Sequence, residues 1–376
     1  MSTAPTSSRD AWAAEEASRL MMHFAARTGL TSDAAPRRYL WTDAFAVCNF
    51  LSLSRIAGEE QYAELALRLV DQVHRVLGTY RDDDERSGWI SGLSDGARHP
   101  TRGGLRIGKP LPERGASEPF DEELEWRRDG QYFHYLTKWM HALNQVHRWT
   151  GEARYGTWAR ELAKVAHDAF VRVEHGRRRM VWKMNTDLTR TLVPSMGHHD
   201  PLDAFITCAE LDAASARAGT PSEPSLTRET ADFAAMVAGG NWATADPLGL
   251  GGLLVDASRI AQLQRLGAFP DKGLLLVLVE AAERGLGIYS YNEDLRQPAS
   301  RRLAFRELGL AIGLSAVELI EAPVPTLAPY LDLGARIRSY WLELRNRETR
   351  LWAEHRDINE VMLATSLVPD GFLLIE

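Results

Sequence analysis

The sequence predicts an all-α protein whose helices pair as six hairpins in a closed ring. Three observations lead to this fold class. Nearly every apolar segment has the helical period, one helix–turn–helix segment recurs, and the links between helices alternate between short and long. The chain has 376 residues, of which 45% are hydrophobic and 25% charged. This is enough apolar material for one large core, so we expect residues 1–376 to form a single domain.

The helical period predicts twelve helices. In chain order they cover residues 8–28, 37–56, 59–79, 130–149, 152–174, 201–218, 225–238, 248–266, 271–287, 300–320, 330–345 and 357–367.

The recurring segment covers residues 55–74 and 148–167, and Gly58-Glu59 of the first copy aligns with Gly151-Glu152 of the second. In each copy we expect the glycine to end one helix. The acid then lies in the first turn of the next helix, where the helix dipole favours it. Repetition of such a unit indicates one hairpin used several times.

The links within the expected hairpins are short, and most links between hairpins are long and rich in Gly, Pro, Trp, Asn, Asp and His. In a ring of hairpins all the long links emerge on one face. Loops on a rigid scaffold usually carry function, so we expect the functional site on that face. The longest link, residues 81–129, is too long to be an ordinary connector.

Composition excludes several classes of partner. The net charge is −7 and the pI about 5.9, which argues against nucleic acid and anionic membranes. The N-terminus has no secretory signal pattern, and we expect a cytoplasmic protein. Cys48 and Cys208 are expected to be buried free thiols. No metal-binding motif or cofactor signature is present in the sequence, so we expect no cofactor. A homodimer is the assembly to test.

The chain resembles the six-hairpin glycosidase-like superfamily of (α/α)6 toroids. Residues 41–66 resemble the segment of unsaturated uronyl hydrolases in which a Trp and an Asp precede an inner helix, and residues 126–143 resemble the start of those enzymes' next inner helix. Residues 194–205 are similar to the Gly-His segment of the N-acylglucosamine 2-epimerases. Thr42-Asp43 departs from the doubled Asp of the uronyl hydrolases, and the long link before Asp129 has no counterpart there. The resemblance implies a small carbohydrate as partner, namely an acidic disaccharide. In its unsaturated form, the double bond of the sugar would be hydrated with an Asp as general acid and base.

Polar and aromatic residues gather where the expected inner helices begin, as in "EWRRDGQYFHYLTKW" at residues 125–139. Sugar hydroxyls need fixed donors and acceptors, and sugar rings stack on aromatic side chains. We therefore interpret this segment as one wall of a carbohydrate site. Asp43 and Asp129 are the expected acid–base pair, and helix capping is the alternative role of each. Asp200, Asp203, Glu125 and Asp357 are competing acids.

Further candidates come from the other helix starts. His199 and Asp200 join Asp43 and Asp129 as catalytic candidates. His134, Lys138, His141 and Gln145 form a polar stripe expected to be buried, and Arg301, Arg302 and Arg306 would suit a sugar carboxylate unless Glu307 or Glu293 pairs with them. The full set of expected substrate-binding residues is Trp41, Glu125, Trp126, Tyr132, His134, His198, Asp203, Tyr291, Arg302, Arg306, Trp352, His355 and Arg356.

These residues predict a glycoside hydrolase that uses carboxylate acid–base catalysis. One alternative is a sugar 2-epimerase or isomerase with paired histidines, His199 and His355. The other is a toroid without catalysis that binds a glycan or a protein.

Overall fold

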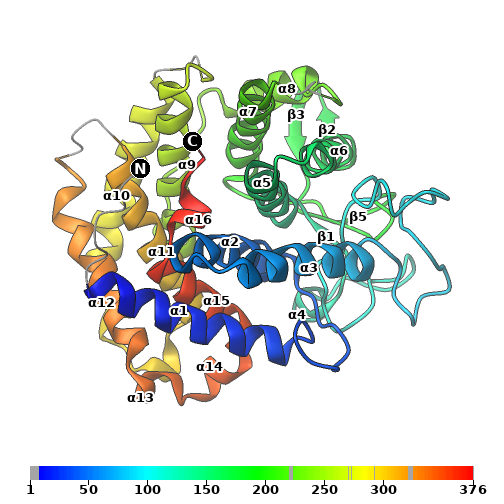
Figure 1. The fold of residues 1–376 in the computed structure, drawn as a ribbon. Helices are drawn as coiled ribbons and strands as arrows, with labels where there is room; N and C mark the ends of the chain where they lie inside the picture. The colour runs from blue at the N-terminus through cyan, green and yellow to red at the C-terminus, as the bar shows by residue number, and fades with distance from the viewer. Residues whose placement is uncertain are drawn as a thin grey trace. The chain divides into compact units, whose positions relative to one another are not determined.

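The computed structural model describes residues 8–219, 223–269, 271, 273–291, 293–320 and 325–375. Residues 1–7, part of the N-terminal stretch read above, lie outside this range. The described chain is mainly helical, with two small antiparallel sheets (Figure 1). None of its helices is both long enough and apolar enough to span a membrane.

All twelve predicted helices are confirmed, with ends displaced by a few residues. They are α1 (Ser8–Arg27), α2 (Leu40–Ala57), α3 (Glu60–Leu77), α5 (Phe133–Thr150), α6 (Ala153–Phe170), α7 (Asp200–Ala218), α8 (Thr227–Val237), α9 (Pro247–Arg265), α10 (Gly273–Tyr291), α11 (Ala304–Ala316), α12 (Leu331–Leu342) and α15 (Arg356–Leu367).

Short elements fill some of the links and were not predicted. The short α-helices are α4 (Glu122–Arg127), α13 (Leu344–Arg347), α14 (Arg350–Glu354) and α16 (Asp370–Leu373). The 3₁₀ turns are η1 (Glu293–Arg296), η2 (Ala299–Arg301), η3 (Val317–Leu319) and η4 (Ala328–Tyr330). The strands are β1 (Gln131–Tyr132), β2 (Val171–Glu174), β3 (Arg177–Met180), β4 (Lys183–Met184) and β5 (Thr191–Val193). Strands this short contain too few residues to show a two-residue period in the sequence.

The recurring hairpin has the expected local structure. Gly58 and Gly151 have left-handed backbones, with φ 67° and 72°. This conformation is accessible to glycine without a Cβ penalty, so both residues end a helix. The next helices begin at Glu60 and Ala153.

The chain packs as two compact units. The terminal unit comprises Met1–Arg27, Cys48–Glu64 and Asn241–Glu376, and the central unit comprises Thr28–Val47 and Leu65–Gly240. The single-domain expectation stays a prediction.

In the terminal unit the first long helix, α1, packs against the last, α15, so the end of the chain lies against its beginning. Arg27 at the end of α1 donates to Asp357 (2.7 Å) and Glu360 (2.8 Å) of α15. In the same unit α9 packs against α10 and α11, and α11 also packs against α12 and α15.

Glycines let α9 and α11 approach closely. A Cβ at Gly251 of α9 would lie 2.1 Å from the carbonyl oxygen of Gly309, and one at Gly313 would lie 2.5 Å from that of Gly251. These glycines therefore serve helix packing. Gly252, the next residue of α9, faces open space.

In the central unit α5 packs against α6 and α7, and α7 against α8. The strands form a three-stranded sheet of order β1-β4-β5 and a separate β2-β3 hairpin. Because β1 leads directly into α5, the first sheet fixes where α5 begins. Cys48 and Cys208 are buried free thiols, as predicted.

Gly251→Ala is expected to lower the free energy of unfolding by about 1–3 kcal/mol, because the added methyl group must displace the α11 backbone. The matched control is Gly252→Ala, where a methyl group meets nothing within 4 Å. Alanine is the better helix former, so the control should raise the free energy of unfolding by up to about 1 kcal/mol. Both values follow from urea unfolding. Equal effects of the two variants would contradict the close α9–α11 packing.

Candidate functional site

The entrance of α5 is held in place by backbone pairing and one buried amide. Gln131 and Tyr132 of β1 pair with Met184 and Lys183 of β4. The buried side chain of Gln131 donates to the carbonyl oxygens of Gly103 (2.9 Å) and Thr186 (2.7 Å). Two distant segments of the chain, around Gly103 and at residues 183–186, are thereby fixed around the first turn of α5.

Seven aromatic side chains gather at this entrance. The set, called the aromatic cluster below, is Tyr39, Trp41, Trp126, Tyr132, His134, Tyr135 and Trp182. Trp182 stacks on Tyr132 (ring centroids 5.3 Å apart) and on His134 (6.1 Å), and meets Trp126 edge to face (5.4 Å). The ring of Trp126 is 49% exposed, whereas Tyr132 is only 2% exposed. The cluster therefore has a solvent-facing side supported by buried rings.

Two tyrosines of the aromatic cluster are joined through their hydroxyl groups. The hydroxyls of Tyr39 and Tyr135 share a hydrogen bond of 2.6 Å, and Trp41 lies 6.5 Å from the ring of Tyr135. Burial raises the pKa of Tyr39 to about 12. Tyr39 therefore stays protonated near neutral pH.

A histidine and a carboxyl group with opposite pKa shifts lie beside the cluster. His134 Nδ1 is 4.0 Å from Asp200 Oδ1. Burial, reinforced by the charge of Asp203, raises the pKa of Asp200 to about 7. Burial, reinforced by the charge of Lys138, lowers the pKa of His134 to about 4. Between these values the carboxyl is protonated and the imidazole is neutral.

Asp200 and Asp203 are both buried but differ in their partners. Asp203 accepts from Lys138 (2.8 Å) and Thr137 (2.5 Å) of α5. Asp200 Oδ2 is buried without a hydrogen-bond partner among the described residues. A Cβ at Gly197 would lie 2.3 Å from this oxygen, so a glycine there leaves space beside it. A buried oxygen without a hydrogen-bond partner raises the free energy of the folded state, and such oxygens are rare in proteins.

The predicted polar stripe of α5 faces α7. His141 is 3% exposed and contacts Glu210 of α7 through Nδ1 (2.9 Å). Lys138 reaches Asp203, whereas Gln145 accepts from Arg148 of its own helix. The expectation that these histidines are largely buried holds for His141, and the side chain of His134 is 31% exposed.

Glu125 belongs to the scaffold of the entrance. The fully buried ammonium of Lys183 donates to Glu125 Oε1 (2.8 Å), and Arg114 donates to Oε2 (2.8 Å). Both oxygens of this predicted substrate ligand are therefore occupied within the protein.

The expected acid–base pair, Asp43 and Asp129, has structural partners. Asp129 is fully buried and accepts from Arg106 (2.6 Å) and from the backbone of Gly108 (3.0 Å). Asp43 accepts from the backbone of Tyr39 (2.9 Å) at the start of α2 and lies 3.5 Å from Arg38. Asp43 thus has its alternative role as a first-turn acid of α2, whereas Asp129 does not cap α5, whose N-cap is Tyr132. A part of either residue in catalysis stays a prediction.

His198 and His199 immediately precede α7, and their rings are 4.5 Å apart. The side chain of His199 makes no capping hydrogen bond to the helix. Its proposed partner, His355, belongs to the terminal unit, so their pairing stays a prediction.

The remaining predicted residues lie in the terminal unit. Arg302 pairs with Glu307 through two hydrogen bonds (2.8 and 2.6 Å), which is the alternative that the sequence left open. Arg306 pairs with Asp246 (2.6 Å), the N-cap of α9. Trp352 is buried against Trp341, Tyr291 is 92% exposed, His355 caps α15, and Arg356 is exposed.

Lys109 was not predicted as a site residue. Its ammonium lies over the rings of Tyr39 (5.3 Å) and Trp126 (5.8 Å). Trp182 was not predicted as a site residue either, although it is a tryptophan in one of the long links, where we expected the functional site.

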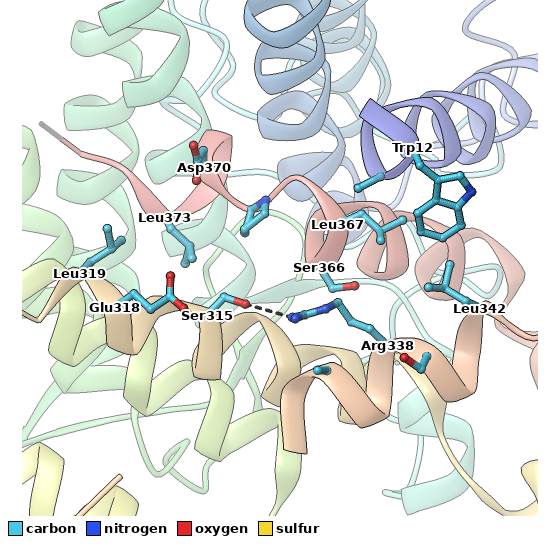
Figure 2. A pocket seen from close by; sticks show the side chains of 14 residues that line it. Trp12, Ser315, Glu318, Leu319, Arg338, Leu342, Ser366, Leu367, Asp370 and Leu373 are labelled. Carbon is cyan, nitrogen blue, oxygen red and sulfur yellow. Dashed lines mark hydrogen bonds between the residues drawn. The ribbon is translucent and has the colours of Figure 1, made fainter. Parts of the chain in front are cut away.

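Two other features of the described chain lie away from the aromatic cluster. His167, Asp168 and Glu229 could share a metal ion, but Asp232, Arg228 and Lys164 already pair with them. A pocket of about 480 Å³ in the terminal unit is lined by Trp12, Ser315 and Arg338, among others, near the C-terminal ends of α11 and α15 (Figure 2). There Arg338 donates to Ser315 (3.1 Å).

Comparison with known proteins identifies the fold. No family model and no curated protein matches the chain. Its structure is similar to that of the cellobiose 2-epimerase from Spirochaeta thermophila DSM 6192, with a TM-score of 0.50 and 12% sequence identity over 88% of this chain and 86% of that one. The fold is thus the all-α (α/α)6 toroid of six hairpins that the sequence predicted.

Asp129→Asn is expected to lower the free energy of unfolding by about 3–5 kcal/mol, because Arg106 would lose its buried counter-charge. The control is Asp83→Asn, an acid 54% exposed that pairs with Arg81. That variant should change the free energy by less than about 1 kcal/mol. Denaturant unfolding measures both. An Asp129→Asn protein of unchanged stability would contradict the structural role of the buried Arg106–Asp129 pair.

Proposed function

We propose that this protein is a carbohydrate-active enzyme that transfers protons on a sugar bound at the entrance of α5. The observation that carries the proposal is the buried carboxyl of Asp200, with one oxygen lacking a partner among the described residues, 4.0 Å from His134 on a wall of aromatic rings. Burial shifts the pKa of Asp200 up and that of His134 down. Two titratable groups whose pKa values are pushed apart are a pattern typical of acid–base sites.

The aromatic cluster supports a sugar as the ligand. Trp126 and Trp182 offer ring surface of the kind on which the apolar face of a pyranose stacks. Around them lie polar groups that can address hydroxyls: the Tyr39–Tyr135 pair, the Lys109 ammonium and the Asp200 carboxyl. A mainly apolar surface with a few convergent polar groups is typical of small-molecule sites.

Isomerisation or epimerisation is the reaction we favour. The C2 proton of an open-chain aldose is acidic because of the C1 carbonyl. A neutral imidazole can remove that proton while a carboxylic acid protonates O1, which gives an enediol. Return of the proton to the other face of C2 gives the epimer, and its delivery to C1 gives the ketose. The shared fold with a cellobiose 2-epimerase supports this order of preference.

Glycoside hydrolysis is the second candidate, and Asp200 is the observation that favours it. A carboxyl group that holds its proton near neutral pH can protonate a glycosidic oxygen. In this case Asp203 is the nearby carboxylate, but Lys138 and Thr137 already occupy one of its oxygens.

Turnover should be greatest between about pH 4 and pH 7 and fall on both sides. Above pH 7 Asp200 loses its proton, and below pH 4 His134 gains one.

We expect Asp200→Asn and His134→Gln each to lower kcat by roughly a hundredfold or more. The assay is mass-balanced product analysis on a panel of free aldoses and disaccharides, with NMR detection of epimers, ketoses and released monosaccharides.

The control variant is Asp332→Asn, which removes an exposed carboxyl of α12 and should leave kcat unchanged. Sugar binding by calorimetry without turnover of any panel member would contradict the enzyme proposal and favour a binding toroid. Full turnover in both Asp200→Asn and His134→Gln would remove this pair from the mechanism.

A further inference from the structure

Lys109 differs from the other lysines whose side chains the structure describes. The chain has five lysines, at positions 109, 138, 164, 183 and 272, and the side chain of residue 272 is not described. Lys138, Lys164 and Lys183 each pair with a carboxylate at 2.8 or 2.9 Å. For Lys109 the described residues provide only aromatic faces, those of Tyr39 and Trp126.

No carboxylate of the described residues lies within salt-bridge distance of the Lys109 ammonium, although the charge of Asp129 acts on it. Asp129 approaches the residue, but its oxygens accept from Arg106 and from the backbone of Gly108 and Lys109. Arg81 donates to the backbone carbonyl of Lys109, not to its side chain. Lys183 adds a second positive charge nearby, and Glu125 already pairs with it.

We propose that Lys109 is a nucleophilic amine that condenses with an aldehyde. The inference rests on the proposed function for the identity of that aldehyde, which would be C1 of an open-chain sugar held at the aromatic cluster. Partial desolvation and a neighbouring cation are the conditions that activate lysines for imine formation.

The reaction balances without a further reagent. The neutral amine attacks the carbonyl carbon, the carbonyl oxygen takes up two protons and leaves as water, and a C=N bond remains. The protonated imine withdraws electrons from C2 more strongly than the carbonyl does, so it would ease removal of the C2 proton. Burial and the charge of Lys183 lower the pKa of Lys109 to about 8. About a quarter of the side chain is then neutral at pH 7.5, a few hundredfold more than for an ordinary lysine.

Reductive trapping tests the proposal. The protein is incubated at pH 7.5 with glycolaldehyde, or separately with D-glucose, in the presence of sodium cyanoborohydride, and the modified lysines are identified by peptide mass spectrometry. We expect glycolaldehyde to modify Lys109 at least tenfold faster than Lys164, which lies outside the aromatic cluster. The rate at Lys109 should rise with pH and level off above about pH 8.

Two variants keep the test specific. Lys109→Arg retains the charge but cannot form an imine, and Lys109→Met removes the charge. Each should abolish the fast labelling, while slow labelling of Lys164 continues. Equal labelling of Lys109 and Lys164 in the unmodified protein overturns the proposal, whatever the turnover. Selective labelling of Lys109 by glycolaldehyde, without labelling by D-glucose or turnover of any sugar, keeps the nucleophilic lysine and instead contradicts the proposed function.

Discussion

The buried ion pair between Arg106 and Asp129 is the interaction on which the entrance of α5 depends. Arg106 also donates to the carbonyl oxygen of Thr79 (2.8 Å), so it ties the end of the α3 segment to the start of α5. The remaining oxygen of Asp129 fixes the backbone of Gly108 and Lys109. The long link between α3 and α5 is therefore a folded part of the scaffold, and it places Lys109 against the aromatic cluster.

The buried acids of the central unit differ in how completely their oxygens are hydrogen-bonded. Asp43, Glu125, Asp129 and Asp203 are buried, and each accepts hydrogen bonds or pairs with a cation. Asp200 is buried as deeply, but one of its oxygens lacks a partner among the described residues. A carboxyl in that position retains a proton because its charged form is poorly solvated. The same physical cause keeps His134 neutral, so burial shifts the pKa values of these two groups in opposite directions.

Much of the fold could be predicted from the sequence because the periodicity of a helix is a local sequence pattern. The 3.6-residue period gave all twelve long helices, and Gly58 and Gly151 marked the hairpin ends. The segment around Tyr132 and His134 was also recognised. Asp200 was among the candidate acids together with Asp43 and Asp129, but the sequence could not show how each acid is solvated or paired, because Asp129 finds its partner Arg106 through the tertiary fold and the solvation of Asp200 depends on burial. Lys109 was missed for a related reason, since an unpaired lysine differs from a paired one only in three dimensions.

The most direct test of this account is the pH dependence of stability in the wild type and in Asp200→Asn. The folded pKa of Asp200, about 7, lies above its unfolded value near 3.8, so the folded state retains a proton that the unfolded state releases. The wild type therefore loses stability from this group as the pH rises from about 4 to 7, and the variant does not. Urea unfolding should show the variant gaining about 1.4 kcal/mol relative to the wild type per pH unit between pH 5 and 6.5, with little further gain above pH 7.5. A difference that is constant from pH 5 to 8 would contradict the account.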